Sequence, residues 1–472
     1  MTINIKNSLR IIAQGLFFIV VIYAFGRLGV VSFDSRLSGD IPVYLQNVST
    51  DAVTLRWHSA SAYLATVKYG TDKDNLQHAL SESEQGNKHR IRLSALKPNT
   101  RYFYSIYNGD TAVETGEQYW FFTAPQASDN EPVRIWITGD QGIAGKTQTE
   151  MRDAMITWTG IHARENKPSV DLWLTTGDNA YRSGSVEQFK EHFFAPFTGI
   201  LRNIPVVPAY GNHDARRWSF FRLFEFPTQA KQNADASEVA LGTKKYFSMD
   251  YGNAHIVMLD TTTSSMEINS PMLNWLKKDL AITQQDWVIV VTHHPPYTHG
   301  THNSDNIKDS GGRMHAMREN VVPVLEQFGV DMVISGHSHG YERSFFMLCN
   351  YKDSQQFNRS YIQDRGDNED QLKLLYRKRS ITRQALSGTI YMVMGSSARA
   401  EDGPYDHPVL PVSLKTAGSV VLDIVGNKLT SNFITTEYTV NDRFYIMKGD
   451  KSAPAARQSC NFKIEPPRSL YY

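Results

Sequence analysis

Two histidines stand one residue apart in the stretch Gly-His-Ser-His-Gly at 336–340, directly after the apolar run 330–334. If that run is a buried strand, Gly336 allows the backbone to turn sharply just past its end. Both imidazole rings can then leave the same bend and face the same pocket. A single pair of this kind is often only a solvated loop, so its meaning depends on whether other polar clusters occupy equivalent positions.

Four further polar clusters also follow apolar runs. They are Gly-Asp-Gln-Gly at 139–142, Gly-Asp-Asn-Ala-Tyr at 177–181, Gly-Asn-His-Asp at 211–214 and His-His-Pro-Pro-Tyr at 293–297. One such cluster alone is explained equally well by a capping aspartate or a loop histidine. Five clusters at the ends of expected strands in one domain indicate a shared site, because ligands bind outside the carboxyl ends of the strands in open α/β sheets.

The candidate side chains are carboxylates, a phenol, an amide and imidazoles, without a thiolate. Hard oxygen donors mixed with imidazole suit iron, manganese or zinc rather than calcium or a soft metal. Seven donors are too many for one tetrahedral ion and suit two ions about 3.5–4 Å apart.

Strands alternating with helices are expected to position these clusters, which predicts an α/β layered domain with at least partly parallel sheets. The expected strands are 133–137, 170–174, 204–207, 255–259, 287–291, 330–334 and 390–393, and the expected helices are 147–165, 185–194, 271–280 and 319–328. The runs 418–424 and 429–435, joined at Gly426-Asn427, predict a closing hairpin. His255 is expected to be a strand residue rather than a ligand.

The region 42–125 instead contains short runs of alternating apolar and polar residues, which is typical of half-buried strands. The segment Leu-Lys-Pro-Asn-Thr-Arg-Tyr at 96–102, together with Trp57 and the closing Phe-Thr-Ala-Pro at 122–125, resembles a fibronectin type III sandwich. The polar stretch 126–132 that follows is expected to be a linker.

The five strand-end clusters together resemble those of the purple acid phosphatases, a branch of the dinuclear metallophosphoesterases. The shared series is Asp-x-Gly, Gly-Asp-x-x-Tyr, Gly-Asn-His-Asp, Val-x-x-His and Gly-His-x-His, all within 133–339. Many members of the wider superfamily carry a histidine ligand where this chain has Gly142, and Tyr181 supplies a donor in its place. The resemblance implies a metallophosphoesterase sandwich of two mixed β-sheets flanked by helices, preceded by the all-β fibronectin III-like sandwich.

The resemblance also implies which residue binds which ion. Asp140, Tyr181 and His339 would hold Fe(III), and Asp178 would bridge to the second ion. A divalent zinc, iron or manganese would take Asn212, His293 and His337. The adjacent His294 is the alternative to His293.

A hydroxide on the metal pair would then attack phosphorus in line with the leaving alkoxide. His213 is the candidate to hydrogen-bond the phosphate and protonate the leaving oxygen, although a role in orienting ligands is also open. His302 is a second catalytic candidate, and Asn303 competes with it for the same position. Glu342 and Arg343 are expected to form a salt bridge that supports the histidine turn.

Three functions follow from this site. The first is hydrolysis of phosphomonoesters with an acid optimum, and the second is a phosphodiesterase or nucleotide hydrolase that uses the same metals. The third, from another class, is an envelope-anchored binding protein with an inert catalytic domain, which the intact motifs argue against. The pocket walls at 298–312 and the polar excursion at 345–387, expected beside the site, would discriminate between the first two.

The N-terminal segment of the chain indicates export. Lys6 and Arg10 precede the apolar segment 11–33, which predicts a signal peptide or an uncleaved signal-anchor, and places the rest in the cell envelope, the periplasm or outside the cell. The expected organisation is a leader at 1–36, the sandwich at 38–125, the catalytic domain at 130–448 and a tail at 449–472.

Composition excludes one class of partner. The 472 residues contain 49 Lys plus Arg against 48 Asp plus Glu. The resulting net charge of +1 lacks the strong basic excess that is typical of nucleic-acid-binding proteins. A small phosphoester is the expected partner. Cys349 and Cys460 are the two cysteines, and either a disulfide that ties the tail to the domain or two buried thiols is consistent with the sequence.

Overall fold

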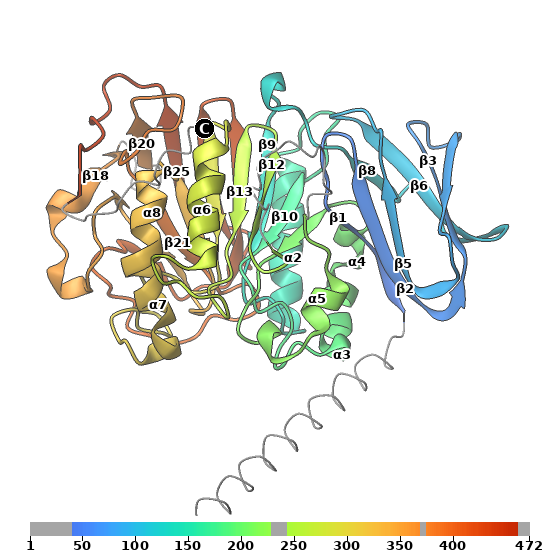
Figure 1. The fold of residues 1–472 in the computed structure, drawn as a ribbon, viewed down its shortest axis with the longest axis horizontal. Coiled ribbons are helices and arrows are strands. Elements are labelled where there is room, and N and C mark those ends of the chain that lie inside the picture. Colours follow the sequence, from blue (N-terminus) through green and yellow to red (C-terminus); the bar gives the residue numbers. More distant parts are fainter. Residues whose placement is uncertain (1–39, 228–242, 369–373, 461–472) are drawn as a thin grey trace, which may run out of the picture.

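The computed structural model describes residues 40–227, 243–368 and 374–460 (Figure 1). It confirms the predicted fold class, a layered α/β body of two mixed sheets preceded by an all-β sandwich. The apolar segment 11–33 lies outside the described residues. Within the described ranges, every helix is too short or too polar to span a lipid bilayer.

The N-terminal sandwich consists of two antiparallel sheets, drawn in blue in Figure 1. One sheet has the order β1-β2-β5, and the other has the order β4-β3-β6-β7 with β8 also paired to β6. Their bounds are β1 Ile41–Gln46, β2 Val53–Tyr63, β3 Ala65–Gly70, β4 His78–Ser81, β5 Gly86–Leu93, β6 Arg101–Asn108, β7 Thr111–Glu114 and β8 Trp120–Phe122.

The first sheet of the body has eight strands in the order β11-β10-β9-β23-β24-β25-β20-β19. Strands β9, β10 and β11 are parallel, so their carboxyl ends meet at one edge. The predicted hairpin is confirmed as β23 and β24, and a further antiparallel strand, β25, follows it. The bounds are β9 Val133–Thr138, β10 Leu172–Thr175, β11 Val206–Pro208, β19 Asp367–Asn368, β20 Leu374–Lys378, β23 Gly418–Val425, β24 Lys428–Thr435 and β25 Val440–Lys448.

The second sheet has seven strands in the order β12-β13-β14-β15-β21-β16-β22. Four consecutive members, β13, β14, β15 and β21, are parallel, and antiparallel strands close both edges. The bounds are β12 Phe247–Tyr251, β13 Ala254–Met258, β14 Trp287–Val291, β15 Met332–Ser335, β16 Tyr341–Arg343, β21 Ile390–Met394 and β22 Val412–Leu414.

The two sheets pack face to face and helices cover the outside. Strand β14 shows the pattern: Ile289 and Val291 lie in the core between the sheets, whereas Val288 and Val290 pack under the outer helices. This is the alternation expected of a strand buried on both faces. The helices are α2 Lys146–Ile161, α3 Val186–Phe189, α4 Ala195–Leu201, α5 Ser219–Leu223, α6 Pro271–Ile282, α7 Arg313–Ala316 and α8 Val322–Gln327.

Three predicted helices differ from the observed ones at their ends. The helix expected at 147–165 ends at Ile161. The helix expected at 185–194 continues through a π-helical turn at Lys190–Phe194 into α4. The helix expected at 319–328 begins earlier, with α7, and reaches α8 through a second π-helical turn at Met317–Val321. A π-helical turn adds one residue and offsets the apolar pattern after it, and helices this short give too few repeats for that offset to be recognised in the sequence.

The sandwich and the body share one continuous hydrophobic core. Tyr44 of β1 packs on Phe194 with ring centroids 4.7 Å apart. The Asn203 side-chain amide donates to the carbonyl oxygens of Gln118 and Trp120, both at 2.8 Å. Contacts of this kind fix the sandwich against α4 and the chain that follows it.

The excursion at 345–387 differs from its prediction as a surface loop beside the site. Its strand β20 pairs with β25 and so belongs to the eight-stranded sheet. The Arg383 guanidinium donates to the carbonyl oxygens of Leu280 and Thr283, at the end of α6. The described part of the excursion therefore builds the sheet edge and the outer helical layer, and its contacts run there rather than to the predicted metal ligands.

The predicted Glu342–Arg343 salt bridge is wrong. Both residues lie on β16, where successive side chains point to opposite faces of the sheet. The Arg343 guanidinium makes a buried bidentate pair with Asp442 of β25, at 2.6 and 3.0 Å, and so joins the two sheets. Glu342 accepts hydrogen bonds from the Thr298 hydroxyl and from the His299 backbone N–H instead.

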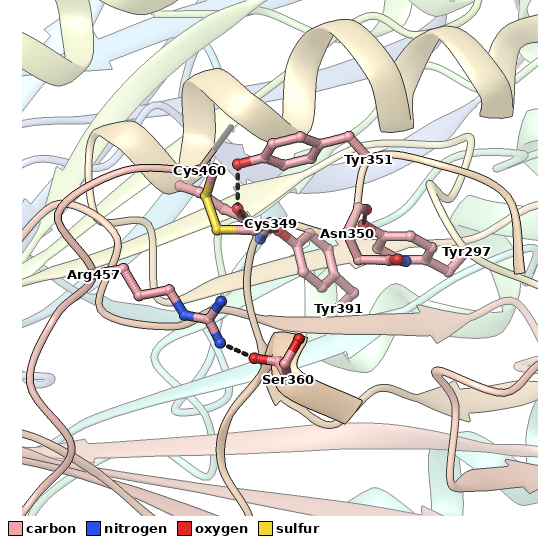
Figure 2. The surroundings of a disulfide bond; sticks show 9 residues. Tyr297, Cys349, Asn350, Tyr351, Ser360, Tyr391, Arg457 and Cys460 are labelled. Carbon is pink, nitrogen blue, oxygen red and sulfur yellow. Dashed lines mark hydrogen bonds between the residues drawn. A yellow bond between two sulfur atoms is a disulfide. The ribbon is translucent and has the colours of Figure 1, made fainter. Parts of the chain in front are cut away.

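A disulfide between Cys349 and Cys460 fastens the end of the described chain (Figure 2). Their Cα atoms lie 5.4 Å apart, and the bond closes a loop over a sequence separation of 111 residues. Hydrogen bonds hold the preceding stretch in place: Arg457 N–H donates to the Leu386 carbonyl at 2.9 Å. The cysteines therefore form the disulfide rather than two separate thiols.

Beneath this disulfide lies a buried carboxylate, Glu326 of α8, which is 1% exposed. It accepts hydrogen bonds from Cys349 N–H at 2.8 Å, Tyr351 Oη at 2.7 Å and Tyr391 Oη at 2.6 Å. Burial raises the pKa of Glu326 to about 7, and the three hydrogen bonds oppose that rise.

This pKa predicts a pH dependence of stability. Folded Glu326 keeps its proton up to about pH 7, whereas the unfolded chain loses it near 4.5, so the free energy of unfolding should fall as pH rises through this window. In Glu326→Gln that contribution is absent. Urea unfolding at pH 4.5 and 7.5 should show the wild type losing about 1–3 kcal/mol more than the variant.

The partly exposed Glu319, earlier in the same helical segment, provides the control variant Glu319→Gln. It should keep the pH dependence of the wild type. Parallel pH profiles for the wild type and Glu326→Gln would show that Glu326 is not the titrating group.

Candidate metal centre

The seven predicted ligands come from loops at the carboxyl ends of five parallel strands. Asp140 follows β9, Asp178 and Tyr181 follow β10, and Asn212 follows β11, all in the eight-stranded sheet. His293 follows β14, and His337 and His339 follow the neighbouring strand β15 in the seven-stranded sheet. Because the two sheets pack face to face, the two sets of loops meet.

The centre of the site is formed by Asp140, Asp178 and His293. All three are buried, and one donor atom from each lies within 4.8 Å of the others. His293 Nε2 is 3.5 Å from Asp178 Oδ1 and 2.8 Å from the side-chain oxygen of Asn212. The other ring nitrogen, Nδ1, is 2.9 Å from the Thr176 carbonyl oxygen, which fixes the ring so that Nε2 faces the carboxylate.

On one side of this centre lie Tyr181 and His339. The Tyr181 hydroxyl is 2.9 Å from Asp140 Oδ1 and 3.2 Å from His339 Nε2. His339 Nε2 is in turn 3.6 Å from Asp140 Oδ1. A carboxylate, a phenol and an imidazole nitrogen therefore point at one small volume.

On the other side lies His337, whose ring centroid is 5.0 Å from that of His293. Its Nε2 is 2.6 Å from the Ser310 hydroxyl, and its backbone N–H donates to Asp140 Oδ2 at 2.8 Å. His302 stacks on it with ring centroids 3.9 Å apart. The structure thus brings all seven predicted ligands into one continuous cluster.

Close approach between the loops explains why a glycine precedes several of the ligands. A Cβ atom on Gly211 would lie 2.1 Å from the backbone nitrogen of Asp178, and one on Gly336 would lie 2.5 Å from Asp140 Oδ2. Asp140, Asp178 and His337 themselves adopt positive φ values of 55°, 55° and 71°. Non-glycine residues in the left-handed region cluster at functional sites.

Mutual charge shifts the pKa values of these groups. Burial and the neighbouring carboxylates Asp140 and Asp178 raise the pKa of Tyr181 well above its usual value. Burial and the surrounding histidines hold the pKa of His337 well below its usual value, which keeps that imidazole neutral. Burial disfavours the charged form of His293, but the carboxylate charges of Asp178 and Asp140 outweigh it and raise its pKa.

The two predicted catalytic histidines lie at the edges of the cluster. His213 is half-buried, with Nδ1 2.7 Å from the Arg182 carbonyl oxygen and Nε2 3.8 Å from Asp178 Oδ2. His302 Nδ1 is 2.8 Å from Asp309 Oδ1. Asn303, the competing candidate, accepts from the Asp305 backbone N–H within its own loop, so His302 is the residue that lies against His337.

His294, the alternative to His293, faces a different group. Its Nδ1 is 3.1 Å from the Thr261 hydroxyl, which also accepts from the His294 backbone N–H at 2.9 Å. The expectation that His255 is a strand residue is confirmed: it lies on β13, between Asp250 and Asp279.

The donor set fits a pair of cations. Two buried carboxylates this close together are costly unless positive charge compensates them, and Tyr181 can ionise only if a cation offsets the same carboxylates. The neutral imidazole of His337 offers a lone pair, and carboxylate, phenol, amide and imidazole donors together suit iron, zinc or manganese.

Two family models match this chain. The model of the calcineurin-like phosphoesterases matches residues 133–341, and the model of the purple acid phosphatase N-terminal domain matches residues 40–123. The chain therefore combines a purple acid phosphatase N-terminal domain with a calcineurin-like phosphoesterase domain.

Curated relatives agree with this placement. Purple acid phosphatase 22 of Arabidopsis thaliana is 28% identical over 267 residues, which cover 55% of this chain and 54% of the relative. Purple acid phosphatase 23 of the same plant is 28% identical over 290 residues, covering 54% and 57%. The chain thus spans about half the length of the curated relatives it matches.

Solved structures show the same fold. The purple acid phosphatase PPD1 from yellow lupin seeds superposes with a TM-score of 0.66 at 17% identity, covering 89% of this chain and 78% of that chain. A structure of PhoD superposes with a TM-score of 0.56 at 13% identity, covering 90% and 92%.

Sequence reasoning missed two charged residues at the site, Arg399 and Glu401. They follow β21, the parallel neighbour of β15, and Glu401 Oε2 lies 2.8 Å from His339 Nδ1. The strand at 390–393 was predicted, so inspecting the loop after it for polar residues, as for the other strands, would have identified them. Ser310 and Asp309, which contact His337 and His302, lie within the predicted wall 298–312.

A cavity of about 860 Å³ opens elsewhere on the body. Trp218, Phe221 and Met272 form part of its mainly apolar wall. None of the seven predicted ligands lines it, so it is separate from the cluster that they form.

Metal removal should destabilise the protein. A cation that binds the folded cluster and not the unfolded chain raises the melting temperature by mass action. Dialysis against a chelator should therefore lower the melting temperature by roughly 5 °C or more in scanning calorimetry. Zinc, manganese or iron should restore it and calcium should not; an unchanged melting temperature in the chelated protein would contradict a metal site here.

Proposed function

We propose that the protein hydrolyses small phosphomonoesters at a dinuclear metal centre, as a metal-dependent acid phosphatase. The convergence of seven oxygen and nitrogen donors from five loops is the observation that carries this proposal. Cations bound there would supply Lewis-acid stabilisation of the phosphoryl group and an activated water molecule.

The proposed ligands divide the cluster between two ions. Asp140, Tyr181 and His339 would hold Fe(III), a hard ion suited to carboxylate and phenolate. Asn212, His293 and His337 would hold a divalent zinc, iron or manganese, and Asp178 would bridge. With Nε2 of His337 directed at Ser310, Nδ1 is the ring atom left to bind the second ion.

The proposed role of His213 is to protonate the leaving alkoxide. Its Nδ1 donates to the Arg182 carbonyl, so Nε2 is the nitrogen that gains and loses the proton. His302 is proposed to assist from the opposite edge, where Asp309 fixes its ring. Both side chains are partly exposed, so they can meet a substrate that enters from solvent.

The proposed location is outside the cytoplasm. A disulfide over a long loop is typical of oxidising compartments, which supports export. Anchoring through the apolar segment 11–33 remains a prediction from the sequence.

Asp178→Asn tests the metal mechanism. The substitution keeps the shape of the side chain and removes the charge proposed to bridge two cations. We expect kcat/KM for phenyl phosphate to fall by about a thousandfold or more, with an unchanged circular dichroism spectrum. Asp153→Asn on the surface of α2 is the matched control, and near wild-type activity in Asp178→Asn would rule out this mechanism.

Tyr181→Phe tests the identity of the first ion. A phenolate bound to Fe(III) gives a charge-transfer band in the visible spectrum, so the wild type should be coloured and the variant bleached. Turnover should fall less than in Asp178→Asn, because Asp140 and His339 still hold the ion. A coloured variant would show that Tyr181 is not the source of the band.

A further inference from the structure

The loop 395–401, after β21, is fastened to both halves of the metal cluster. Gly395 N–H donates to the Gly340 carbonyl at 3.2 Å, and Ser397 N–H donates to the Gly139 carbonyl at 3.2 Å. Glu401 N–H donates to the His339 carbonyl at 3.0 Å. Backbone hydrogen bonds on both sides give this loop a defined position beside Asp140 and the histidine turn.

From this loop the Arg399 guanidinium extends over the first-ion side of the cluster. Its Cζ lies 5.2 Å from the centroid of the Tyr181 ring, and its Nη2 lies 3.4 Å from His339 Nε2. Nη1 pairs with Glu401 Oε1 at 3.0 Å, and Oε2 of the same carboxylate faces His339 Nδ1. Glu401 therefore holds Arg399 and His339 in a fixed relation.

Some N–H groups of the Arg399 guanidinium are available to a further acceptor. The Arg399 side chain is 38% exposed, so it reaches the solvent at the site, and its Nε has no hydrogen-bond partner among the described residues. Under the proposed ligand assignment, Nε2 of His339 would bind a cation. The Nη2 donor of Arg399 is then left for another acceptor close to the cluster.

The chemistry of that acceptor follows from the donor. Guanidinium presents a rigid fork of N–H groups that matches phosphate oxygens. A phosphomonoester carries three non-bridging oxygens and up to two negative charges, whereas a diester carries two such oxygens and one charge. If the two cations take two non-bridging oxygens, a monoester still has a third, charged oxygen for the guanidinium, whereas a diester has an uncharged alkylated oxygen there.

We propose that Arg399, positioned by Glu401, binds a non-bridging phosphate oxygen and makes the site selective for phosphomonoesters over diesters. The inference rests on the proposed function and specifies its substrate class.

The test compares two esters with the same leaving group, phenyl phosphate and methyl phenyl phosphate. The metal-loaded wild type is compared with Arg399→Ala and Arg399→Lys, and Arg101→Ala in the N-terminal sandwich is the control. Metal content is measured for each variant. Calorimetric titration measures the affinity for inorganic phosphate, and so tests the contact between Arg399 and a phosphate oxygen without turnover.

In Arg399→Ala, we expect phosphate affinity and kcat/KM for phenyl phosphate to fall by about 10- to 100-fold at unchanged metal content. The value for methyl phenyl phosphate should change far less, so the preference for the monoester shrinks. Arg399→Lys should be intermediate, because lysine keeps the charge and loses the fork. The Arg101 control should match the wild type.

Three outcomes would overturn the inference: unchanged phosphate affinity, equal losses on both esters, or loss of bound metal in Arg399→Ala. The last would show that Arg399 acts only by supporting His339. A wild type that binds phosphate and hydrolyses neither ester would contradict the proposed function instead, and the phosphate titration would still decide the role of Arg399.

Discussion

The molecule is arranged around two buried carboxylates, Asp140 and Asp178, which have donor atoms within 4.8 Å of each other in a site where buried negative charge needs positive compensation. Desolvation penalises each charge, and their proximity adds repulsion. Nearby histidines supply part of the compensation. Against the effect of burial, Asp178 and Asp140 raise the pKa of His293, and Asp140 and Glu401 raise the pKa of His339. Cations would supply the rest. Metal binding would therefore stabilise this part of the fold.

Bringing these groups together imposes conditions on the rest of the chain. Two sheets must present the carboxyl ends of their parallel strands to the same place, and the loops must approach so closely that a side chain at Gly211 or Gly336 would collide. Away from the site, the buried Arg343–Asp442 pair joins the sheets. Removing one residue of such a pair by substitution is strongly destabilising, because the other residue is left as an uncompensated buried charge. The N-terminal sandwich packs against the body, and the two share one hydrophobic core.

The sequence allowed the alternation of strands and helices and the grouping of the seven side chains to be predicted, because each cluster follows a clear apolar run. Arg399 and Glu401 escaped notice because their loop carries neither histidine nor a Gly-Asp pair. The fact that Glu342 and Arg343 are neighbours in the sequence did not reveal their partners. Neighbouring residues of a strand face opposite sides of the sheet, and the partners of these two residues lie far away along the chain. The excursion at 345–387 was misplaced because its overall polarity hides β20, which lies between β25 and the edge strand β19.

The central claim is that two cations occupy this cluster. Anomalous diffraction from crystals of the metal-loaded protein, recorded at the iron and zinc absorption edges, tests it most directly. The account predicts two peaks on either side of Asp178, with an iron signal among Asp140, Tyr181 and His339 and a second ion among Asn212, His293 and His337. A single peak, or metal bound only elsewhere on the molecule, would contradict it.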